Sequence, residues 1–594
     1  MAIHVYYSKN ILDFQELLLN KKEFEMKKDY PLYEAVAIRD FRDLVENAAD
    51  KYSDKIAYSY KVSPLDDETV KVSFEELRQD CRALGTAAHL RGLSGEKVAL
   101  VGVASYGWPC SYYSLMAAGA VTVPIDKNMT AEDIAGMINK AKCKAVFYSE
   151  MDDKLEYLKA NCPTVELYVS IVNGKKVSES DAEISELIAE GNEAIENGNS
   201  IYLDYEIDPD KLASIVFTSG TTGKGKGVML TQTNIVSDMT QGTYLFTITG
   251  KTLMVLPPHH TFGSTVNFVG HLALGSEVYI SNGIKYFQRE MKEQQPTHLI
   301  LVPLFIETLY KRIWATAEKS GQANKLRNAI KLSNALRKTG VDLRKKLFKN
   351  VTANFGGKLE MVICGGAALN QDVIDFFEAI GVTTLNGYGR TECAPLISCN
   401  RNNYQKQGSV GIPIIGEQVK IADPDENGEG EICVKGSNVM LGYYEEPEAT
   451  AAVFDEEGYF KTGDYGKLDE DGWLYITGRL KNLIIFSNGK NVYPEEIEAE
   501  VARIYGVNEV VVYAGESKAN PTKEVIVAEI FPDFDGLKEK GISDVKKYFT
   551  EEVRKANANM VSYKAVGLVK IRDCEFPKNT SRKITRFAID KSID

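Results

Sequence analysis

A glycine-rich segment at residues 218–228, with the sequence TSGTTGKGKGV, carries groups suited to binding phosphate. Four glycines leave its backbone free to turn N–H groups towards an anion: Gly220, Gly223, Gly225 and Gly227. Hydroxyl and ammonium groups add further donors: Thr218, Ser219, Thr221, Thr222, Lys224 and Lys226. Because the segment directly follows the apolar run ASIVF, we predict a polyphosphate-binding loop at the end of a buried strand.

Two other interpretations of this loop compete with that prediction. A glycine-rich loop after a strand is often a plain turn, which the four hydroxyls and two lysines within eleven residues disfavour. A P-loop NTPase is the second alternative, because Gly220 to Lys226 fits the pattern G-x-x-x-x-G-K. However, Gly227 stands where that motif needs Ser or Thr, and the following VMLT predicts a strand instead of a helix.

The loop resembles the phosphate loop of the adenylate-forming (AMP-binding) family, which includes acyl-CoA synthetases, luciferases and the adenylation domains of peptide synthetases. The usual form is TSGTTGxPKGV; here Gly225 replaces the proline and Lys226 stays in register. Further blocks resemble the family's motifs in the family's order: LPPHHTFG (256–263), ICGGAAL (363–369), LNGYGRTECAPL (385–396), FKTGDYGKLDEDGWLYITGRLKN (460–482), SNGKNVYPEEIE (487–498) and PKNTSRKITRF (577–587). The resemblance covers the chain from about residue 36 to 590.

The resemblance implies four catalytic residues: Lys583, Thr391, Glu392 and His260. Lys583 stands six positions after Pro577, where the family has its catalytic lysine. Thr391 is suited to donate to the α-phosphate, and Glu392 offers a carboxylate for Mg²⁺, a hard ion that prefers oxygen. In the family the histidine at the position of His260 lies beside the acyl pocket, although a lone histidine is more often a core residue.

The resemblance also implies a nucleotide site. Its residues are Thr218, Ser219, Gly220, Thr221, Thr222, Gly223, Lys226, Gly365, Gly366, Ala367, Asn386, Gly387, Tyr388, Gly389, Thr391, Asp464, Ile476 and Arg479. The Tyr388 ring is suited to stacking on adenine. Asp464 has two acceptor oxygens for the two ribose hydroxyls, and Arg479 matches the second ribose contact. By itself, an aspartate in TGD is more often a turn residue.

A hinge and a thiol tunnel follow from the same resemblance. Lys481, two positions after the arginine, matches the pivot on which the family's C-terminal domain rotates, and Gly489 matches the glycine beside the path of the coenzyme A thiol. In the last block Arg582 replaces the usual glycine and Asn579 the usual threonine. The alternative for Lys583 is a solvated lysine in a basic tail.

Helices alternate with buried strands through most of the chain. The predicted helices are 36–49 and 75–93, and the predicted strands are 97–102, 120–126, 144–149, 212–220, 252–258, 297–303 and 358–366. This alternation predicts an α/β protein with a largely parallel sheet. With the resemblance, it predicts a large N-terminal body of several subdomains and a small, mobile α+β C-terminal domain.

The predicted domain boundaries follow a change of sequence texture after residue 405 towards short strands and glycine-rich turns. We predict an adenylation domain at 1–478, a hinge at 479–482 and a lid domain at 483–594. The lid should contain strands at 510–515, 525–531 and 566–571 and a helix around 543–556. A basic helical insertion is expected at about 311–352.

Composition narrows the class of protein. The chain has 594 residues, 44% of them hydrophobic and 26% charged, with a formal net charge of −13. These are ordinary globular values, and the acidic balance argues against a nucleic-acid partner. Nine unpatterned cysteines favour a reducing compartment. With no signal peptide or membrane-spanning run recognised, we expect a cytoplasmic protein.

The expected substrate is a fatty acid. Amino-acid-activating relatives carry an aspartate early in the block after the histidine motif, whereas residues 261–274 here are small and apolar. Residues 302–313 and 354–366, with the basic insertion between them, resemble the long-chain fatty acid–CoA ligase branch. The implied cofactors are ATP, Mg²⁺ and coenzyme A, and the implied products are acyl-CoA, AMP and pyrophosphate. Medium-chain acids, transfer to an acyl carrier protein, and a catalytically inactive binding protein remain alternatives.

A basic segment stands out within this acidic chain. Residues 311–350 contain twelve Lys and Arg but only two acids, Glu318 and Asp342. Within it, 323–338 predicts an amphipathic helix with Leu326, Ala329 and Ile330 on its apolar face. Such helices often lie on anionic membranes, so we predict peripheral contact with the inner membrane surface through 311–350. The alternative is that the apolar face packs on the body and the charges only solvate it.

Overall fold

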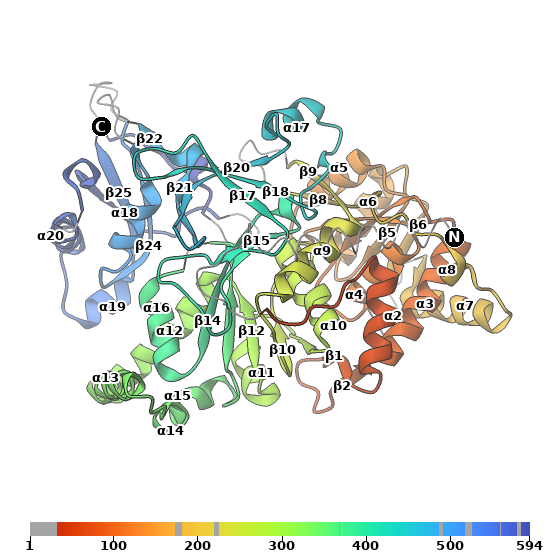
Figure 1. The fold of residues 1–594 in the computed structure, drawn as a ribbon, viewed down its shortest axis with the longest axis horizontal. Coiled ribbons are helices and arrows are strands. Elements are labelled where there is room, and N and C mark those ends of the chain that lie inside the picture. Colours follow the sequence, from red (N-terminus) through yellow and green to blue (C-terminus); the bar gives the residue numbers. More distant parts are fainter. Residues whose placement is uncertain are drawn as a thin grey trace.

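The computed structural model describes residues 32–172, 181–218, 225–367, 369–485, 491–516, 525–558, 560–578 and 584–593. Two large sheets form its centre, and smaller sheets follow towards the C-terminus. In Figure 1 the C-terminal segment, in blue, lies at one end of the molecule and the first helices lie at the other.

The first large sheet has nine strands. In spatial order they are β16 (Ile412–Pro413), β15 (Leu396–Cys399), β14 (Thr383–Gly389), β13 (Met361–Cys364), β12 (His298–Leu301), β10 (Lys251–Met254), β11 (Glu277–Ile280), β1 (Ile56–Tyr60) and β2 (Val70–Ser73). The pairs from β14 through β11 to β1 are parallel, and the pairs at both edges are antiparallel. Because β13 and β14 are adjacent and parallel, the predicted motifs at 363–369 and 385–396 lie side by side at the carboxyl ends of these two strands.

The second large sheet has eight strands. They are β19 (Gly442–Tyr443), β9 (Gly227–Thr231), β8 (Leu212–Phe217), β4 (Val121–Ile125), β3 (Lys97–Val101), β5 (Ala145–Tyr148), β6 (Leu167–Ser170) and β7 (Ala182–Glu183). Strands β4, β3, β5 and β6 are buried along almost their whole length, as parallel strands covered on both faces must be. The short apolar runs of the sequence are these strands, and the predicted α/β class is confirmed.

Two of the helices, Phe41–Tyr52 and Phe74–Leu90, correspond to those predicted at 36–49 and 75–93, the first of them shifted by a few residues towards the C-terminus. The described α-helices are α2 (Phe41–Tyr52), α3 (Phe74–Leu90), α4 (Gly107–Ala117), α5 (Ala131–Ala141), α6 (Asp152–Asn161), α7 (Ile184–Glu196), α8 (Ile201–Asp204), α9 (Gln232–Thr243), α10 (Gly270–Leu274), α11 (Phe287–Gln294), α12 (Pro303–Lys319), α13 (Ala323–Lys338), α14 (Arg344–Leu347), α15 (Lys349–Thr352), α16 (Gln371–Ile380), α17 (Pro447–Val453), α18 (Pro494–Val501), α19 (Phe534–Glu539) and α20 (Val545–Asn557). Helix α3 begins with a capping box, in which Ser73 and Glu76 satisfy each other's backbone N–H groups. Such local signals explain why the position of α3 was predictable.

Three smaller sheets follow. Four antiparallel strands come first: β17 (Gln418–Ala422), β18 (Gly430–Lys435), β20 (Phe460–Leu468) and β21 (Leu474–Arg479). The last sheets are the pair β22 (Ile484–Ile485) and β23 (Asn491–Val492), and the three strands β24 (Val507–Ala514), β25 (Ile526–Pro532) and β26 (Leu568–Ile571). Two hydrophobic cores form entirely from residues after 483, on either face of the β24–β26 sheet. The division at 479–482 and the mobility of the C-terminal part stay predictions.

The apolar face of the basic helix packs against neighbouring helices. Leu326, Ala329 and Ile330 of α13 pack in a core with Trp314 of α12 and Phe376 of α16. Leu326 is buried and Ala329 and Ile330 are half-buried there, so the packing that one alternative expected for this face is present. The charged side of α13 remains exposed.

Two further observations concern membranes and cysteines. Within the described ranges, no helix has the length and apolar character needed to cross a membrane. All nine cysteines are free, and eight of them are buried.

Candidate active site

The neck of the predicted phosphate loop joins two antiparallel strands. Strand β8 ends at Phe217 and β9 begins at Gly227, directly opposite it. The backbone N–H of Thr218 donates to the carbonyl of Lys226 at 2.9 Å, which closes the neck. The strand after the loop confirms the sequence argument against a P-loop, which needs a helix there. Ser219, Gly220, Thr221, Thr222 and Gly223 lie outside the described residues.

Gly225 is required by the close approach of two backbone segments. A Cβ built at this position would lie 2.4 Å from the carbonyl oxygen of Thr218. The glycine that replaces the family's proline is therefore matched to the geometry of this neck, because a larger residue would force the two segments apart.

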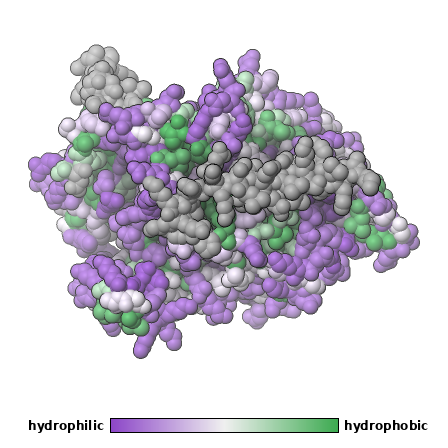
Figure 2. All heavy atoms as spheres, in the orientation of Figure 1, coloured by the Kyte–Doolittle hydropathy of each residue, from purple (hydrophilic) through white to green (hydrophobic). Residues whose placement is uncertain are grey.

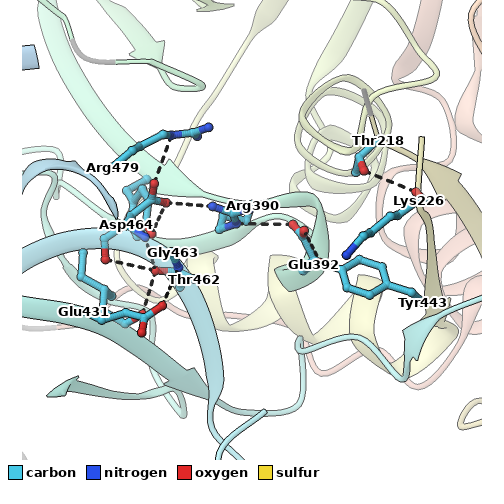
Figure 3. Close-up of polar contacts among 12 residues, drawn as sticks. Thr218, Lys226, Arg390, Glu392, Glu431, Tyr443, Thr462, Gly463, Asp464 and Arg479 are labelled. Atoms are coloured by element: carbon cyan, nitrogen blue, oxygen red, sulfur yellow. Dashed lines mark hydrogen bonds and ion pairs between the residues drawn. The ribbon is translucent and has the colours of Figure 1, made fainter. Parts of the chain in front are cut away.

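Lys226 connects the loop to the predicted magnesium ligand through an aromatic ring. Its Nζ lies 4.4 Å from the centroid of the Tyr443 ring, within the range of a cation–π interaction. The Tyr443 hydroxyl donates to Glu392 Oε1 at 3.0 Å. Strand β19, which carries Tyr443, pairs with β9 next to the loop. Figure 3 shows Lys226, Tyr443 and Glu392 facing one another from three separate segments.

Arg390 joins Glu392 to Asp464 (Figure 3). Its Nε lies 3.4 Å from Glu392 Oε2, and its Nη1 lies 3.2 Å from Asp464 Oδ2. Burial disfavours the charge of Arg390, but the carboxylates of Glu392 and Asp464 outweigh that effect and raise its pKa. The guanidinium therefore stays charged and balances two carboxylates that are almost fully buried.

Asp464 meets Arg479 and Tyr388, as expected of residues in one nucleotide site. Asp464 on β20 lies directly opposite Arg479 on β21, and Arg479 Nε is 3.1 Å from Asp464 Oδ1. The Tyr388 hydroxyl donates to Asp464 Oδ2 at 2.8 Å, and burial together with this carboxylate raises the pKa of Tyr388. The backbone N–H of Asp464 donates to Thr462 Oγ1 at 3.1 Å within β20, which holds the strand where it presents the carboxylate.

The glycine-rich ends of β13 and β14 lie side by side. Cys364, the last residue of β13, pairs with Asn386 on β14. Gly365 follows at once, and a Cβ there would lie 3.4 Å from the carbonyl oxygen of Gly387. Gly366 has a φ of +86°, which favours glycine. The structure thus brings these two segments together; their remaining predicted members, Ala367 and Gly389, lie at the same strand ends.

His260 lies at the entrance to a buried helical segment. Its carbonyl accepts from the N–H of Ser264 at 2.8 Å, just before the π-helix η1 (Phe262–Val269). The His260 ring lies 4.2 Å, centroid to centroid, from that of His259. The ring of Phe262 would contact a Cβ at Gly365 at 3.2 Å, so the histidine block adjoins the predicted nucleotide site.

The remaining predicted residues are Thr391, Ile476, Lys481, Gly489 and Lys583. Thr391 is the first residue of the 3-10 helix Thr391–Cys393, which also contains Glu392. Ile476 is 36% exposed on β21, and Lys481 is exposed in the turn Leu480–Asn482. Gly489 and Lys583 lie outside the described residues.

The basic residues that flank Lys583 form ion pairs with glutamates. Lys578 pairs with Glu509 of β24, and Arg586 Nη2 lies 2.6 Å from Glu498 Oε1 of α18. Residues 578 and 584 also form a β-bridge across the intervening segment. These flanking residues are therefore not part of a freely solvated tail.

Sequence reasoning missed Arg390 and Tyr443. Arg390 stands inside the YGRTE block, so its place in the motif was a usable signal. Tyr443 reaches Glu392 only because β19 pairs with β9, a long-range contact that no local pattern predicts.

Comparison with known proteins identifies the class of molecule that this fold and site define. Residues 45–444 match the family described as AMP-binding enzyme, and the chain belongs to that family. ATP-bound MatB from Rhodopseudomonas palustris has the same fold, with a TM-score of 0.72 at 24% identity over 92% of this chain and 98% of that one.

Two relatives are similar over most of their length. The chain is 29% identical over 573 residues to a chloroplastic long-chain-fatty-acid–[acyl-carrier-protein] ligase of Arabidopsis thaliana, covering 83% of this chain and 78% of the relative. It is 28% identical over 507 residues to long-chain-fatty-acid–CoA ligase 1 of Cavia porcellus, covering 78% of this chain and 70% of the relative.

Proposed function

We propose that this protein activates a long-chain fatty acid with ATP to an acyl-adenylate and transfers the acyl group to coenzyme A, releasing AMP and pyrophosphate. One observation carries the proposal: Lys226 of the phosphate loop, Glu392 and Asp464, which come from three distant blocks, lie on one connected line of polar contacts. A phosphate-binding end, a carboxylate and a ribose-binding end follow one another in the order that a magnesium-bound nucleotide would need.

In the first step a carboxylate oxygen of the fatty acid attacks the α-phosphorus of ATP, and pyrophosphate leaves. Both reactants are anions, so the protein's task is to position them and neutralise charge. We assign the β- and γ-phosphates to the 218–226 loop, the α-phosphate to Thr391 and the ribose to Asp464 and Arg479. Lys583 would bridge the incoming carboxylate and the α-phosphate.

The residues present suit Mg²⁺ bound together with the nucleotide. Mg²⁺ is usually held by one or two carboxylates plus substrate phosphates, and Glu392 is an almost buried carboxylate one aromatic ring away from Lys226. When bound, the ion would supply positive charge to the phosphates. Glu392 would hold it, while Tyr443 orients that carboxylate.

In the second step the thiol displaces AMP from the acyl-adenylate. We assign to Lys481 the pivot for a rotation that withdraws Lys583, and to Gly489 the wall of the thiol's path. Lys481 lies in the short turn between β21 of the body and β22 of the C-terminal part. Domain closure of this kind completes a site and excludes water.

A long apolar acid is favoured by the segment after His260. In η1 and α10, Val266, Phe268, Val269 and Leu272 are buried, and no acid in residues 261–274 is present to pair with an amino group. Both relatives described above are also named for long-chain fatty acids.

An acyl carrier protein is the second acceptor to test, because the Arabidopsis relative is named for one. The test supplies ATP, Mg²⁺ and a series of fatty acids from short to long, with either coenzyme A or phosphopantetheinylated carrier protein, and measures thioester. We expect the largest kcat/KM for long acids with coenzyme A. Thioester on the carrier protein alone would replace the acceptor, and no thioester with any acid would contradict the proposal.

The basic segment suits weak contact with an anionic membrane, now without its buried apolar face. Lys325, Arg327, Lys331, Arg337 and Lys338 of α13 are exposed. Leu332, Val341, Leu343 and Leu347 are also exposed, between 38% and 52%. Figure 2 shows apolar atoms surrounded by hydrophilic ones at the corner where α13 and α14 lie. Contact with a membrane at this corner would bring the enzyme close to long-chain fatty acids dissolved in that membrane.

A further inference from the structure

Arg390 contacts both carboxylates of the proposed nucleotide site, although the motif resemblance assigns it no role. It is placed by β14, which ends one residue earlier, and its N–H donates to the carbonyl of Pro395 at 2.8 Å. The Arg390 side chain is 23% exposed, against 7% for Glu392 and 4% for Asp464. The charge of Arg390 is thus shared between two nearly buried acids.

The donors around Asp464 leave little room for a ribose. A carboxylate has about four lone-pair positions. Among the described residues, Tyr388 and Arg390 contact Oδ2, and Arg479 contacts Oδ1. Two ribose hydroxyls need two positions, so one of these donors must leave when a nucleotide binds.

Arg390 is the donor that can leave without vacating the ribose site. Tyr388 is buried, with its ring in the main core, and Arg479, although 55% exposed, is itself the expected second ribose contact. Arg390 Nε already faces Glu392, so the guanidinium can release Asp464 and keep one ion pair. Its charge also competes with any cation that binds at Glu392 Oε2.

We propose that Arg390 is a positioning residue that holds Glu392 and Asp464 in place in the nucleotide-free enzyme and releases Asp464 when ATP binds. This inference rests on the proposed function, in which Asp464 binds ribose and Glu392 holds Mg²⁺. Nucleotide binding then includes the cost of breaking the Arg390–Asp464 contact, and Mg²⁺ binding includes repulsion from the guanidinium.

The test measures binding to the full chain in two titrations, adenosine alone and Mg²⁺ in the presence of ATP. Arg390→Met removes the competing donor and its charge at similar length. We expect adenosine to bind about fivefold tighter, because binding no longer has to break the Arg390–Asp464 contact, and a hydrogen bond between charged groups is costly to break. The Mg²⁺ concentration for half-maximal ATP binding should fall, because the site loses one positive charge.

Two variants separate the lone-pair effect from the charge effect. Tyr388→Phe frees Oδ2 without changing charge, so it should tighten adenosine binding and leave the Mg²⁺ requirement unchanged. Arg572→Met removes a guanidinium that pairs with Glu529 at 2.7 Å in the C-terminal sheet, and it should change neither titration.

Arg390→Lys is a second variant in case Arg390→Met does not fold. Its ammonium keeps the positive charge but cannot contact both carboxylates as the guanidinium does. It should shift adenosine binding in the same direction by less. Adenosine binding that is unchanged or weaker in both folded Arg390 variants would overturn the inference while leaving the proposed function intact. A wild-type chain that binds no ATP would overturn the proposed function, and this inference with it.

Discussion

Some polar contacts of the proposed nucleotide site join different sheets, whereas the ion pairs beside the 579–583 segment stay within the C-terminal part. In the site, Arg390 after β14 reaches Asp464 on β20, and Tyr443 on β19 reaches Glu392. Beside the segment, the acidic partners of Lys578 and Arg586 are Glu495, Glu498, Glu509 and Glu575. All four belong to the C-terminal part.

This difference suits a separation between binding the nucleotide and moving the catalytic lysine. The partners of the carboxylates that would hold ribose and metal are Tyr388, Arg390, Tyr443 and Arg479, all of which precede the C-terminal part. The residues flanking Lys583 are anchored to α18 and β24, so the lysine would travel with the C-terminal sheet. An enzyme built in this way can keep the nucleotide in place while it moves its catalytic lysine.

The largest effect is expected for Lys583→Ala. Loss of one charge-stabilising donor typically costs about 10²–10³ in rate, and we expect that loss in adenylate formation. Thioester formation from a supplied acyl-adenylate should be far less affected, because the lysine has by then withdrawn. Equal impairment of both half-reactions would contradict a lysine that moves.

Gly489→Trp is the converse variant. A bulky ring should slow thioester formation by about tenfold or more, on the scale of overpacking penalties, and leave the first-turnover release of pyrophosphate nearly intact. A missing pyrophosphate burst would show that Gly489 supports the fold instead of the thiol's path.

Asp464→Ala should act on the nucleotide alone. Hydrogen bonds to charged groups contribute about 1.5–3 kcal/mol each, so ATP should bind about tenfold to hundredfold more weakly. Isothermal titration of the full chain measures this directly. The unfolding profile of the C-terminal part, followed by hydrogen exchange, should not change; unchanged ATP affinity would remove Asp464 from the site.

Arg586→Gln should act on the C-terminal part alone, and its cost should depend on pH. Burial raises the pKa of Glu498 to about 7, and Arg586 opposes that rise. Glu498 is therefore neutral below its folded pKa and ionised above it, and only the ionised form needs the guanidinium. We expect destabilisation of about 2 kcal/mol, between exposed and buried pairs, that appears as pH rises through about 7.

Hydrogen-exchange protection of β24 and β25 across this pH range is the measurement, with ATP affinity as the control. Glu498→Gln should remove the pH dependence in the same background. A cost for Arg586→Gln that is constant with pH would contradict ionisation of Glu498 as its cause, and a parallel loss of ATP affinity would show that the two sets of contacts are not independent.

The smallest effect concerns the membrane. Replacing Lys325, Arg327, Lys331, Arg337 and Lys338 with Gln should weaken binding to anionic vesicles by at least about tenfold at low salt, which needs only two of the five to lie near the surface, since each basic residue there contributes up to about 1 kcal/mol. Salt should abolish the difference. Co-sedimentation that shows no binding, or binding indifferent to these substitutions, would refute membrane contact.

The sequence predicted well what depends on local pattern. Alternating helices and short apolar strands gave the α/β class, and motif spacing placed Asp464 and Arg479, which the structure brings face to face. It could not decide what long-range packing decides. The packing of the apolar face of α13 on α12 and α16 was only one of two alternatives, and Tyr443, which reaches Glu392 through a strand pairing far along the chain, was missed. The roles given to Lys583 and Gly489 remain predictions.

The central claim is that this chain makes an acyl-adenylate from a fatty acid, and ATP–pyrophosphate exchange tests it most directly. The assay uses the full chain with Mg²⁺, ATP and labelled pyrophosphate, without any thiol acceptor. The account predicts exchange that a long-chain fatty acid stimulates, that amino acids do not, and that Lys583→Ala abolishes. Exchange stimulated by amino acids, or ATP cleavage to ADP without exchange, would contradict it.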